Sequence, residues 1–485
     1  MRKWLPLFAA CLGTFMLLID VTIVNVALPD IAVDLRAGLS SLQWVVDGYA
    51  LALAALLLVL GSLADRVGAK RAYLAGLALF AVASLGCGVA GTATNLIAGR
   101  VLQGVGGAAM FATTLSLLHA TYTGRDRGIA FSIWGAVTGA AAGIGVVLGG
   151  VLTDLLSWRW IFFVNLPIAV LAIALTATVF PASARRGDRA VDVPGMLAFA
   201  TAATALTYGV IRGGEHGWSD GLTVLALVLG VAALAGFGLV ESRSTAPMFP
   251  LVLLRNRVFG ATLLGASGQT FAAFACTPLV SLWLQQQLRM TPLHAGLALL
   301  PMAATAFLVA AVFGRFLHDV EPKWTIGAGL VVIGAGTGLL TLIGPGSSWT
   351  ALVPGFVVLG VGVGVNAPAL VSVGMAAVPP QQGGTAAGAV NTARQLGLAL
   401  GVAVLGTVFR GVAGPAQPLS LSRFVAGLDA AFVVAAGVGL VFGTAAFALF
   451  HRARTAATTG APDREAVAAR RIRPGWGPPP PAPPA

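Results

Sequence analysis

The N-terminal stretch Leu5–Leu28, LPLFAACLGTFMLLIDVTIVNVAL, decides the class of fold. It carries a single charged side chain, Asp20, within a largely apolar run. A helix of about 20 apolar residues crosses the hydrocarbon core of a bilayer. The run follows Arg2 and Lys3, but it is too long for the core of a signal peptide, and no small-residue cleavage site closes it. We therefore expect an uncleaved first membrane span.

The rest of the chain has the same composition. Of its 485 residues, 57% are hydrophobic and 9% are charged, whereas an ordinary soluble domain carries about 25% charged residues. A soluble core cannot hide this much apolar surface, so lipid must cover part of it. We predict an all-α polytopic membrane protein with fourteen transmembrane helices. The apolar runs lie at about 5–28, 42–64, 71–91, 95–119, 128–152, 161–180, 192–212, 221–240, 258–286, 293–317, 324–343, 350–375, 384–409 and 427–450.

The basic residues indicate the orientation. The net charge is +12, but the Lys and Arg residues are scattered between apolar runs and form no stripe, which argues against nucleic-acid binding. An even number of spans places both termini on one side. That side would hold 21 of the 29 Lys and Arg residues, and the opposite side six. Because cytoplasmic loops are enriched in Lys and Arg, we predict cytoplasmic termini and a multi-pass protein of the inner (plasma) membrane of a bacterium.

A weak internal repeat divides the chain. Gln103-Gly104-Val-Gly106 lines up with Leu359-Gly360-Val-Gly362, and Gly61–Lys70 lines up with Gly314–Lys323. Repeated halves are typical of secondary transporters. The predicted units are a six-helix half (1–190), two inserted helices (191–245), a second six-helix half (246–450) and a disordered, basic, Pro-rich cytoplasmic tail (451–485).

The loop between the second and third runs carries a motif, Gly61-Ser-Leu-Ala-Asp-Arg-Val-Gly-Ala-Lys-Arg71. Its first glycine permits close helix approach, and its second permits a tight turn. An acid here caps the next helix or pairs with an arginine. The spacing resembles the loop signature of the major facilitator superfamily. We expect a role in conformational switching for Gly61, Asp65, Arg66, Gly68, Lys70 and Arg71.

Three further segments resemble the fourteen-helix drug:proton antiporter branch of that superfamily. They are Ile19–Pro29 in the first span, Arg100–Ala108 in the fourth span, and Ser157–Pro167 after the fifth span. The resemblance implies the major facilitator fold, with two six-helix halves and two inserted helices. It also implies alternating access, and a central cavity lined by the first and fourth spans.

The fifth span departs from this pattern. The antiporter motif usually places Gly-Pro two residues before a glycine pair, but here Gly145 is followed by Val146, and the pair is Gly149-Gly150. The three glycines still permit tight helix packing. A bend supplied by proline would be weaker or differently placed.

Charges inside the membrane are the candidate functional residues, since each costs about 2.5–3.5 kcal/mol at mid-bilayer. At about 1.5 Å per residue, Asp20, Asp47 and Arg100 fall in one layer of the outer half, and we predict that these residues couple transport to protons. Asp47 is expected either to take part in proton coupling or to be solvated at the outer rim. The repeat aligns Arg100 with Phe356, so packing does not require an arginine there. Further polar residues within spans are Asn25, Gln103, Asn391 and Arg394.

Arg394 has three alternative roles from sequence: pairing with carbonyl groups, binding an anionic substrate group, or holding its helix in place. The sequence as a whole favours a secondary active transporter, monomeric in the lipid bilayer, that exports small apolar or amphipathic compounds such as drugs in exchange for protons. An alternative is a dedicated exporter of one endogenous metabolite. A membrane enzyme or a sensor is a further alternative that the sequence disfavours. There is no nucleophile elbow, metal-ligand spacing or phosphate loop, and Cys11, Cys87 and Cys276 lie alone in apolar runs. No cofactor or metal is expected.

Overall fold

The structure is a computed structural model, and it describes residues 2–181, 192–244, 247, 249–313, 320–378, 383–414 and 420–459. All regular elements in these ranges are helices, as predicted for an all-α membrane protein. Within the described residues, thirteen helical spans are long and apolar enough to cross a membrane. The 32-residue helix α5 (Gly124–Leu155) takes the place of the remaining predicted span. The predicted tail beyond residue 459 and the repeat segment 314–319 lie outside the described residues.

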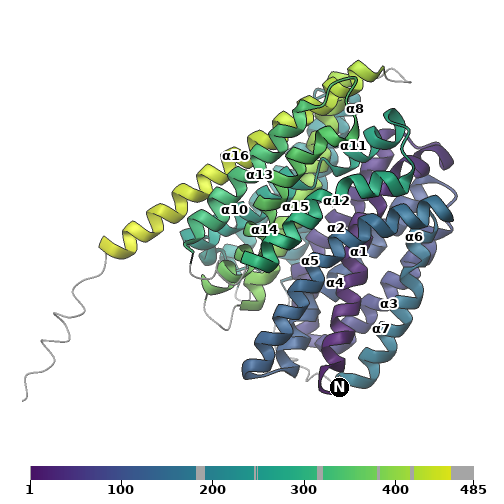
Figure 1. Cartoon of the computed structure of the whole chain (residues 1–485). Coiled ribbons are helices and arrows are strands. Elements are labelled where there is room, and N and C mark those ends of the chain that lie inside the picture. Colours follow the sequence, from purple (N-terminus) through teal and green to yellow (C-terminus); the bar gives the residue numbers. More distant parts are fainter. Residues whose placement is uncertain are drawn as a thin grey trace, which may run out of the picture.

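The elements fall into three groups along the chain (Figure 1). The N-terminal half contains α1 (Leu5–Asp34), α2 (Leu39–Val67), α3 (Ala69–Gly88), α4 (Ala93–Thr121), α5, α6 (Trp160–Phe163) and α7 (Asn165–Val179). The insert contains α8 (Val193–His216) and α9 (Gly221–Arg243). The C-terminal half contains α10 (Arg257–Ala273), α11 (Thr277–Leu282), η3 (Trp283–Gln287), α12 (Pro292–Phe313), η5 (Lys323–Ala328), α13 (Gly329–Leu339), η6 (Leu340–Leu342), η7 (Trp349–Leu352), α14 (Val353–Ala376), α15 (Gly383–Ala413) and α16 (Leu421–Thr459).

Prolines explain two breaks within runs predicted as single helices. The sixth span is divided between α6 and α7, where Pro167 lacks the N–H that would bond to the preceding turn. The ninth is divided between α10 and α11, where Pro278 lies in the first turn of α11. The final helix differs in the opposite sense, because α16 continues to Thr459 and includes residues assigned to the disordered tail. Its last turns are rich in alanine and arginine, which are strong helix formers.

The glycines of the internal repeat pack in equivalent ways in the two halves. A Cβ at residue 104 would lie 2.6 Å from the carbonyl oxygen of Tyr49 on α2, and one at residue 106 would lie 2.8 Å from that of Gly76 on α3. A Cβ at residue 360 would lie 2.6 Å from the carbonyl oxygen of Met302 on α12, and one at residue 362 would lie 2.8 Å from that of Gly329 on α13. Thus α4 packs between α2 and α3 as α14 packs between α12 and α13.

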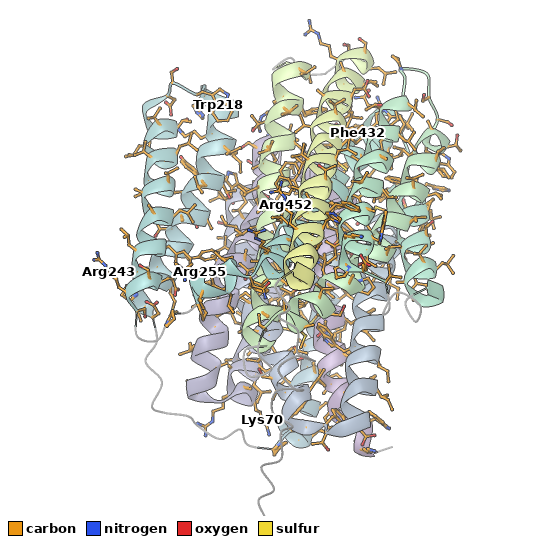
Figure 2. The ribbon with its side chains drawn as sticks, turned by 90° about the vertical axis from the view of Figure 1, so that its left-hand side faces the viewer. Lys70, Trp218, Arg243, Arg255, Phe432 and Arg452 are labelled. Atoms are coloured by element: carbon orange, nitrogen blue, oxygen red, sulfur yellow. The ribbon has the colours of Figure 1, made fainter. Side chains whose placement is uncertain are left out.

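The halves meet where α2 packs against α15, α5 against α12, and α1 against α11. The inserted helix α8 packs against both α2 and α15, and so covers one of these seams. Figure 2 shows the α8–α9 hairpin beside the main bundle, with Trp218 at one end and Arg243 at the other. We call the end of the bundle that holds the N-terminus and Lys70 the proximal end, and the end that holds Trp218 the distal end.

The two ends differ in how the halves share an apolar core. One large cluster at the distal end joins both halves, with members such as Ile23 of α1, Leu279 of α11 and Val402 of α15. Toward the proximal end, one cluster belongs to the N-terminal half and another to the C-terminal half. A smaller cluster there links Val59 of α2 to the insert and to α15. The described side chains therefore close the space between the halves most extensively at the distal end.

Candidate functional site

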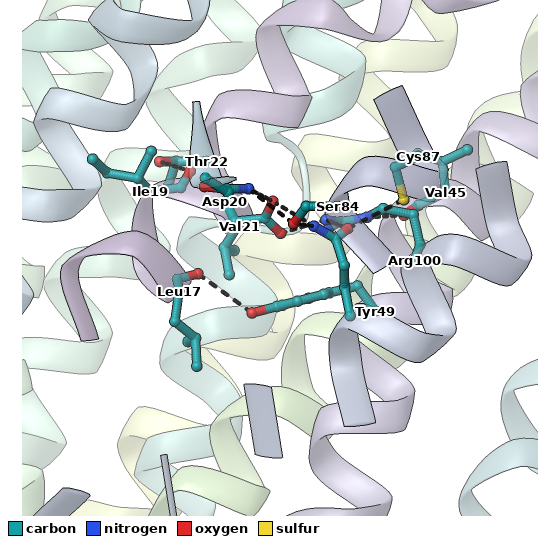
Figure 3. Close-up of polar contacts among 12 residues, drawn as sticks. Leu17, Ile19, Asp20, Val21, Thr22, Val45, Tyr49, Ser84, Cys87 and Arg100 are labelled. Atoms are coloured by element: carbon teal, nitrogen blue, oxygen red, sulfur yellow. Dashed lines mark hydrogen bonds and ion pairs between the residues drawn. The ribbon is translucent and has the colours of Figure 1, made fainter. Parts of the chain in front are cut away.

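An ion pair inside the N-terminal half forms the centre of the candidate site (Figure 3). Arg100 of α4 donates through Nη1 to the Oδ2 atom of Asp20 on α1. Asp20 is 0% exposed and Arg100 is 1% exposed. Two of the three predicted coupling residues are therefore in direct contact and shielded from solvent.

Amide side chains complete the surroundings of the carboxylate. Gln103 Nε2 donates to Asp20 Oδ1 at 3.2 Å, and Asn165 Nδ2 donates to the same oxygen at 3.1 Å. The Oγ atom of Ser84 accepts from both amides, at 2.8 Å from Gln103 and 3.4 Å from Asn165. Four helices, α1, α3, α4 and α7, thus converge on one buried polar network.

The guanidinium of Arg100 is held on its other sides as well. Its Nε atom donates to the carbonyl oxygen of Val45 at 3.0 Å, and Nη1 also donates to Gln103 Oε1 at 2.9 Å. Its Cζ atom lies 4.3 Å from the centre of the Tyr49 ring, a cation–π distance. The Tyr49 hydroxyl in turn donates to the carbonyl oxygen of Leu17 at 3.3 Å. The arginine is therefore fixed against α2 while it reaches α1.

The charges of this network compensate each other. Removing one partner of a buried pair is costly, since it leaves an uncompensated charge. A change in the spacing of α1 and α4 that separates the pair would therefore be unfavourable unless another group takes the place of Arg100 beside Asp20.

The third predicted coupling residue, Asp47, lies apart from this network. Val45 and Tyr49 face Arg100, and at 100° per residue Asp47 points to the opposite side of α2. Its side chain is 0% exposed, and neither carboxylate oxygen has a hydrogen-bond partner among the described residues. The expectation that Asp47 is solvated at the outer rim is therefore wrong, because packing around α2 covers it completely.

The other intramembrane polar residues do not join the network. Asn25 donates to the carbonyl oxygen of Val21 within α1. Asn391 is buried on α15. The carbonyl oxygen of Arg394 accepts a hydrogen bond from Thr270 Oγ1 at 2.6 Å. Within the described chain the Arg394 guanidinium has no ion-pair partner.

The loop motif connects α2 and α3 to the end of α7. Gly68 has a φ angle of 95°, which favours glycine and lets the chain turn directly from α2 into α3. Lys70 Nζ donates to the carbonyl oxygens of Ala177 and Phe180, at 2.7 Å and 2.5 Å, at the C-terminus of α7. Gly61 packs against Ala112 of α4, and Arg71 is exposed. The side chains of Asp65 and Arg66 lie outside the described part.

The glycines of the fifth span join α5 to two neighbours. Gly145 and Gly149 pack against Ile19 and Ile23 of α1, where any side chain would meet backbone atoms. Gly150 packs against α12 of the other half, where a Cβ would lie 2.6 Å from the Cα atom of Leu293. The helix α5 is continuous through Val146, as expected when no proline interrupts it.

Sequence reasoning missed several members of the network. Asn165 falls within the Ser157–Pro167 motif and lies four residues into its apolar run, close to the depth of Arg100, which lies five residues into its own run. Depth along each run therefore identifies it. Ser84 is one of many small polar residues in apolar runs, so nothing in the sequence distinguishes it. The contribution of the Val45 carbonyl oxygen depends on the backbone and has no sequence signal.

Comparison with known proteins identifies the family of the chain. Residues 10–402 match the family model of the Major Facilitator Superfamily. The chain is 35% identical to puromycin resistance protein pur8 of Streptomyces alboniger, over 95% of this chain and 94% of that protein. It is 35% identical to multidrug resistance protein Stp of Mycobacterium tuberculosis, over 83% of this chain and 75% of that protein. It is 33% identical to the tetracenomycin C resistance and export protein of Streptomyces glaucescens, over 86% and 78%.

Solved structures show the same fold at much lower sequence identity. A peptide transporter POT in complex with sulfate superposes with a TM-score of 0.68 at 17% identity, over 92% of this chain and 94% of that one. The human organic anion transporter MFSD10 superposes with a TM-score of 0.61 at 16% identity, over 92% and 99%. Together with the match over most of the sequence, this shows that the chain belongs to the Major Facilitator Superfamily.

Proposed function

We propose that this protein exports small apolar or amphipathic compounds, antibiotics among them, in exchange for protons. The observation that carries the proposal is the buried Asp20–Arg100 pair with its two amide donors. The similarity to proteins named for drug resistance and for export supports the substrate class and the direction of transport.

The coupling mechanism follows from the chemistry of the pair. Arg100, Gln103 and Asn165 all donate to Asp20, so the paired state favours the ionised carboxylate. When substrate, or a shift of α1 against α4 within the N-terminal half, separates the pair, an uncompensated carboxylate in apolar surroundings is costly, and Asp20 binds a proton. Return of Arg100 displaces that proton. One exchange of partners thus links proton entry to substrate exit, and each proton that crosses a 100 mV potential supplies about 2.3 kcal/mol.

The orientation of the bundle fits export from the cytoplasm. The excess of Lys and Arg lies on the side of the N-terminus, so we assign the proximal end to the cytoplasm and the distal end to the exterior. The shared apolar core at the distal end then corresponds to an inward-facing state that is ready to accept substrate.

Transport by inside-out membrane vesicles tests the proposal. An acid interior should drive uptake of a fluorescent dye or an antibiotic, and a protonophore should abolish it. The same vesicles with Asp20→Asn should show no gradient-driven uptake at an equal amount of protein. If uptake by the wild-type protein does not depend on the proton gradient, the proposed coupling is overturned. If one class of compound is not taken up while others are, the range of substrates is narrower than proposed.

A dedicated exporter of one metabolite is the second candidate. It is favoured by similarity to proteins named for single antibiotics, such as the methylenomycin A resistance protein of Streptomyces coelicolor. A binding screen of the purified protein against dyes, antibiotics and cellular metabolites separates the two. Binding of several unrelated compounds supports multidrug export, and binding of one compound supports the dedicated exporter.

A further inference from the structure

A glutamine of the N-terminal half reaches across to the other half at the distal end. Gln43 of α2 is 5% exposed, and its Nε2 atom donates to the carbonyl oxygen of Val402 on α15 at 3.1 Å. Its Oε1 atom accepts from Arg410 Nη1 at 2.5 Å. A Cβ at Gly406 would overlap the amide of Gln43, so this glycine creates the space that the glutamine occupies.

A second glutamine makes the reciprocal contact. Gln285 belongs to η3, a π-helical turn of the C-terminal half. Its Nε2 atom donates to the carbonyl oxygen of Val26 on α1 at 2.6 Å and to Ser281 Oγ at 3.1 Å. Each half therefore inserts one glutamine amide against the backbone of the other half.

The inserted hairpin is fastened to one side of this closure. Arg410 Nη2 donates to the carbonyl oxygen of Ile211 on α8 at 3.4 Å, and Thr407 Oγ1 donates to that of Val210 at 3.4 Å. Gly214 of α8 packs directly on Thr407, where a Cβ would lie 3.0 Å from the Cβ atom of the threonine. Toward α2, by contrast, the ring of Tyr208 lies 6.2 Å from that of Trp44 and no hydrogen bond joins the two helices in the described chain.

We propose that Gln43 and Gln285 are the gate residues of the distal end, and that the α8–α9 hairpin moves with the C-terminal half through Arg410 and Thr407. The proposal rests on alternating access, as in the proposed function, but not on proton coupling. When the distal end opens, the contacts of Gln43 to Val402 and Arg410 break, as does the contact of Gln285 to Val26. The contacts from α15 to α8 persist.

Glutamine is chemically suited to this position. Its amide is neutral, so breaking the contact separates no ion pair, and water can replace both partners. It also carries no titratable proton, so the distal gate can open without a protonation step of its own.

Accessibility of a buried cysteine tests the gate. In a background with Cys11, Cys87 and Cys276 replaced by alanine that retains efflux, Leu279→Cys places a thiol in the distal cluster. A membrane-impermeant maleimide applied from the distal side reports how often this end opens. Gln285→Leu removes one hydrogen bond between the halves and should raise the labelling rate roughly fivefold, as expected for a bond that contributes about 1 kcal/mol. Gln43→Leu removes two such bonds and should raise the rate at least as much.

Gln43→Glu gives Arg410 a charged partner and should lower the labelling rate. The matched control is Gln286→Leu, which changes the exposed neighbour of Gln285. Labelling rates that are equal in the wild type and in both gate variants would overturn the role of the glutamines. This measurement needs no proton gradient, so it can fail while the proposed function stands.

Paired cysteines in the same background test the movement of the hairpin. A disulfide between Gln43→Cys and Gly406→Cys joins the halves and should abolish efflux, and reduction should restore it. A disulfide between Gly214→Cys and Thr407→Cys joins α8 to α15 and should leave efflux unchanged. Arrest by the second disulfide would show that the hairpin moves against the C-terminal half and would overturn that part of the proposal.

Discussion

Helices α4 and α14 share a glycine framework but differ in the residues beside it. Gly104 and Gly106 fit α4 between two neighbours, and Gly360 and Gly362 fit α14 in the same way. Four residues before the first glycine of each pair, α4 carries Arg100 and α14 carries Phe356. Arg100 is fully buried in a polar network, whereas Phe356 is 4% exposed within the distal apolar cluster.

The difference separates what the fold requires from what the site requires. Close approach of three helices needs the glycines in both halves, because any side chain would meet backbone atoms. The same geometry accommodates either a guanidinium or a phenyl ring. Packing therefore does not require the buried charge in α4, and we assign Arg100 a functional role.

Asp20→Asn should have the largest effect on function and should not disturb the glycine packing that α4 and α14 share. The amide keeps the size of the side chain but cannot bind and release a proton, so gradient-driven efflux should fall to the background of vesicles without the protein. Phe356→Leu is the control in the other half and should retain efflux. Dye transport with an imposed pH gradient, at matched protein levels, measures both. Full activity of Asp20→Asn would remove this residue from the mechanism and direct attention to Asp47.

Arg100→Leu should damage stability as well as transport. It leaves Asp20 buried without its cation, a loss of about 3–5 kcal/mol for a buried pair. The double variant with Asp20→Asn should recover much of the thermal stability in detergent but no efflux. A double variant as unstable as Arg100→Leu alone would indicate that the arginine stabilises the fold mainly through Val45 and Tyr49.

The glycines should respond alike in the two halves. Gly104→Ala and Gly360→Ala each place a methyl group 2.6 Å from a backbone carbonyl oxygen, and overpacking of this kind costs about 1–3 kcal/mol. Thermal unfolding of the two purified variants should shift downward by similar amounts. A large shift for one and none for the other would break the structural equivalence of α4 and α14.

Sequence patterns predicted the membrane architecture and the elements of this comparison. The lengths of the apolar runs locate the spans, and the glycine spacing relates α4 to α14. Depth along the runs placed Asp20 and Arg100 in one layer. The same estimate grouped Asp47 with them, because distance along a helix does not tell which face a side chain occupies. The contacts of Asn165, Ser84 and Gln43 depend on how distant helices are rotated, and local sequence does not encode that rotation.

The smallest effect is expected for a second ion pair, which is paired like Asp20 and Arg100 but is not buried. It therefore tests whether burial, rather than pairing, distinguishes the Asp20–Arg100 pair. Arg212 Nε donates to Asp220 Oδ2 at 2.8 Å in the α8–α9 hairpin, with 19% and 27% of the two side chains exposed. The hydrogen bond from Arg212, with one from the Thr223 backbone, lowers the pKa of Asp220 from 3.8 to about 2. Since the folded-state pKa lies below the unfolded value, the contribution of this pair to stability is present above about pH 4 and is lost only as the pH falls toward 2. Asp220 therefore stays ionised from pH 5 to 8 and cannot exchange protons in the range where efflux is measured.

Asp220→Asn should change efflux by less than roughly twofold, as expected for a pair that solvent screens, and should not alter the pH dependence of efflux between pH 5 and 8. Parallel pH profiles of the wild type and the variant test this. A shifted profile would mean that a solvent-screened pair takes part in coupling, and burial would no longer be what distinguishes Asp20 and Arg100.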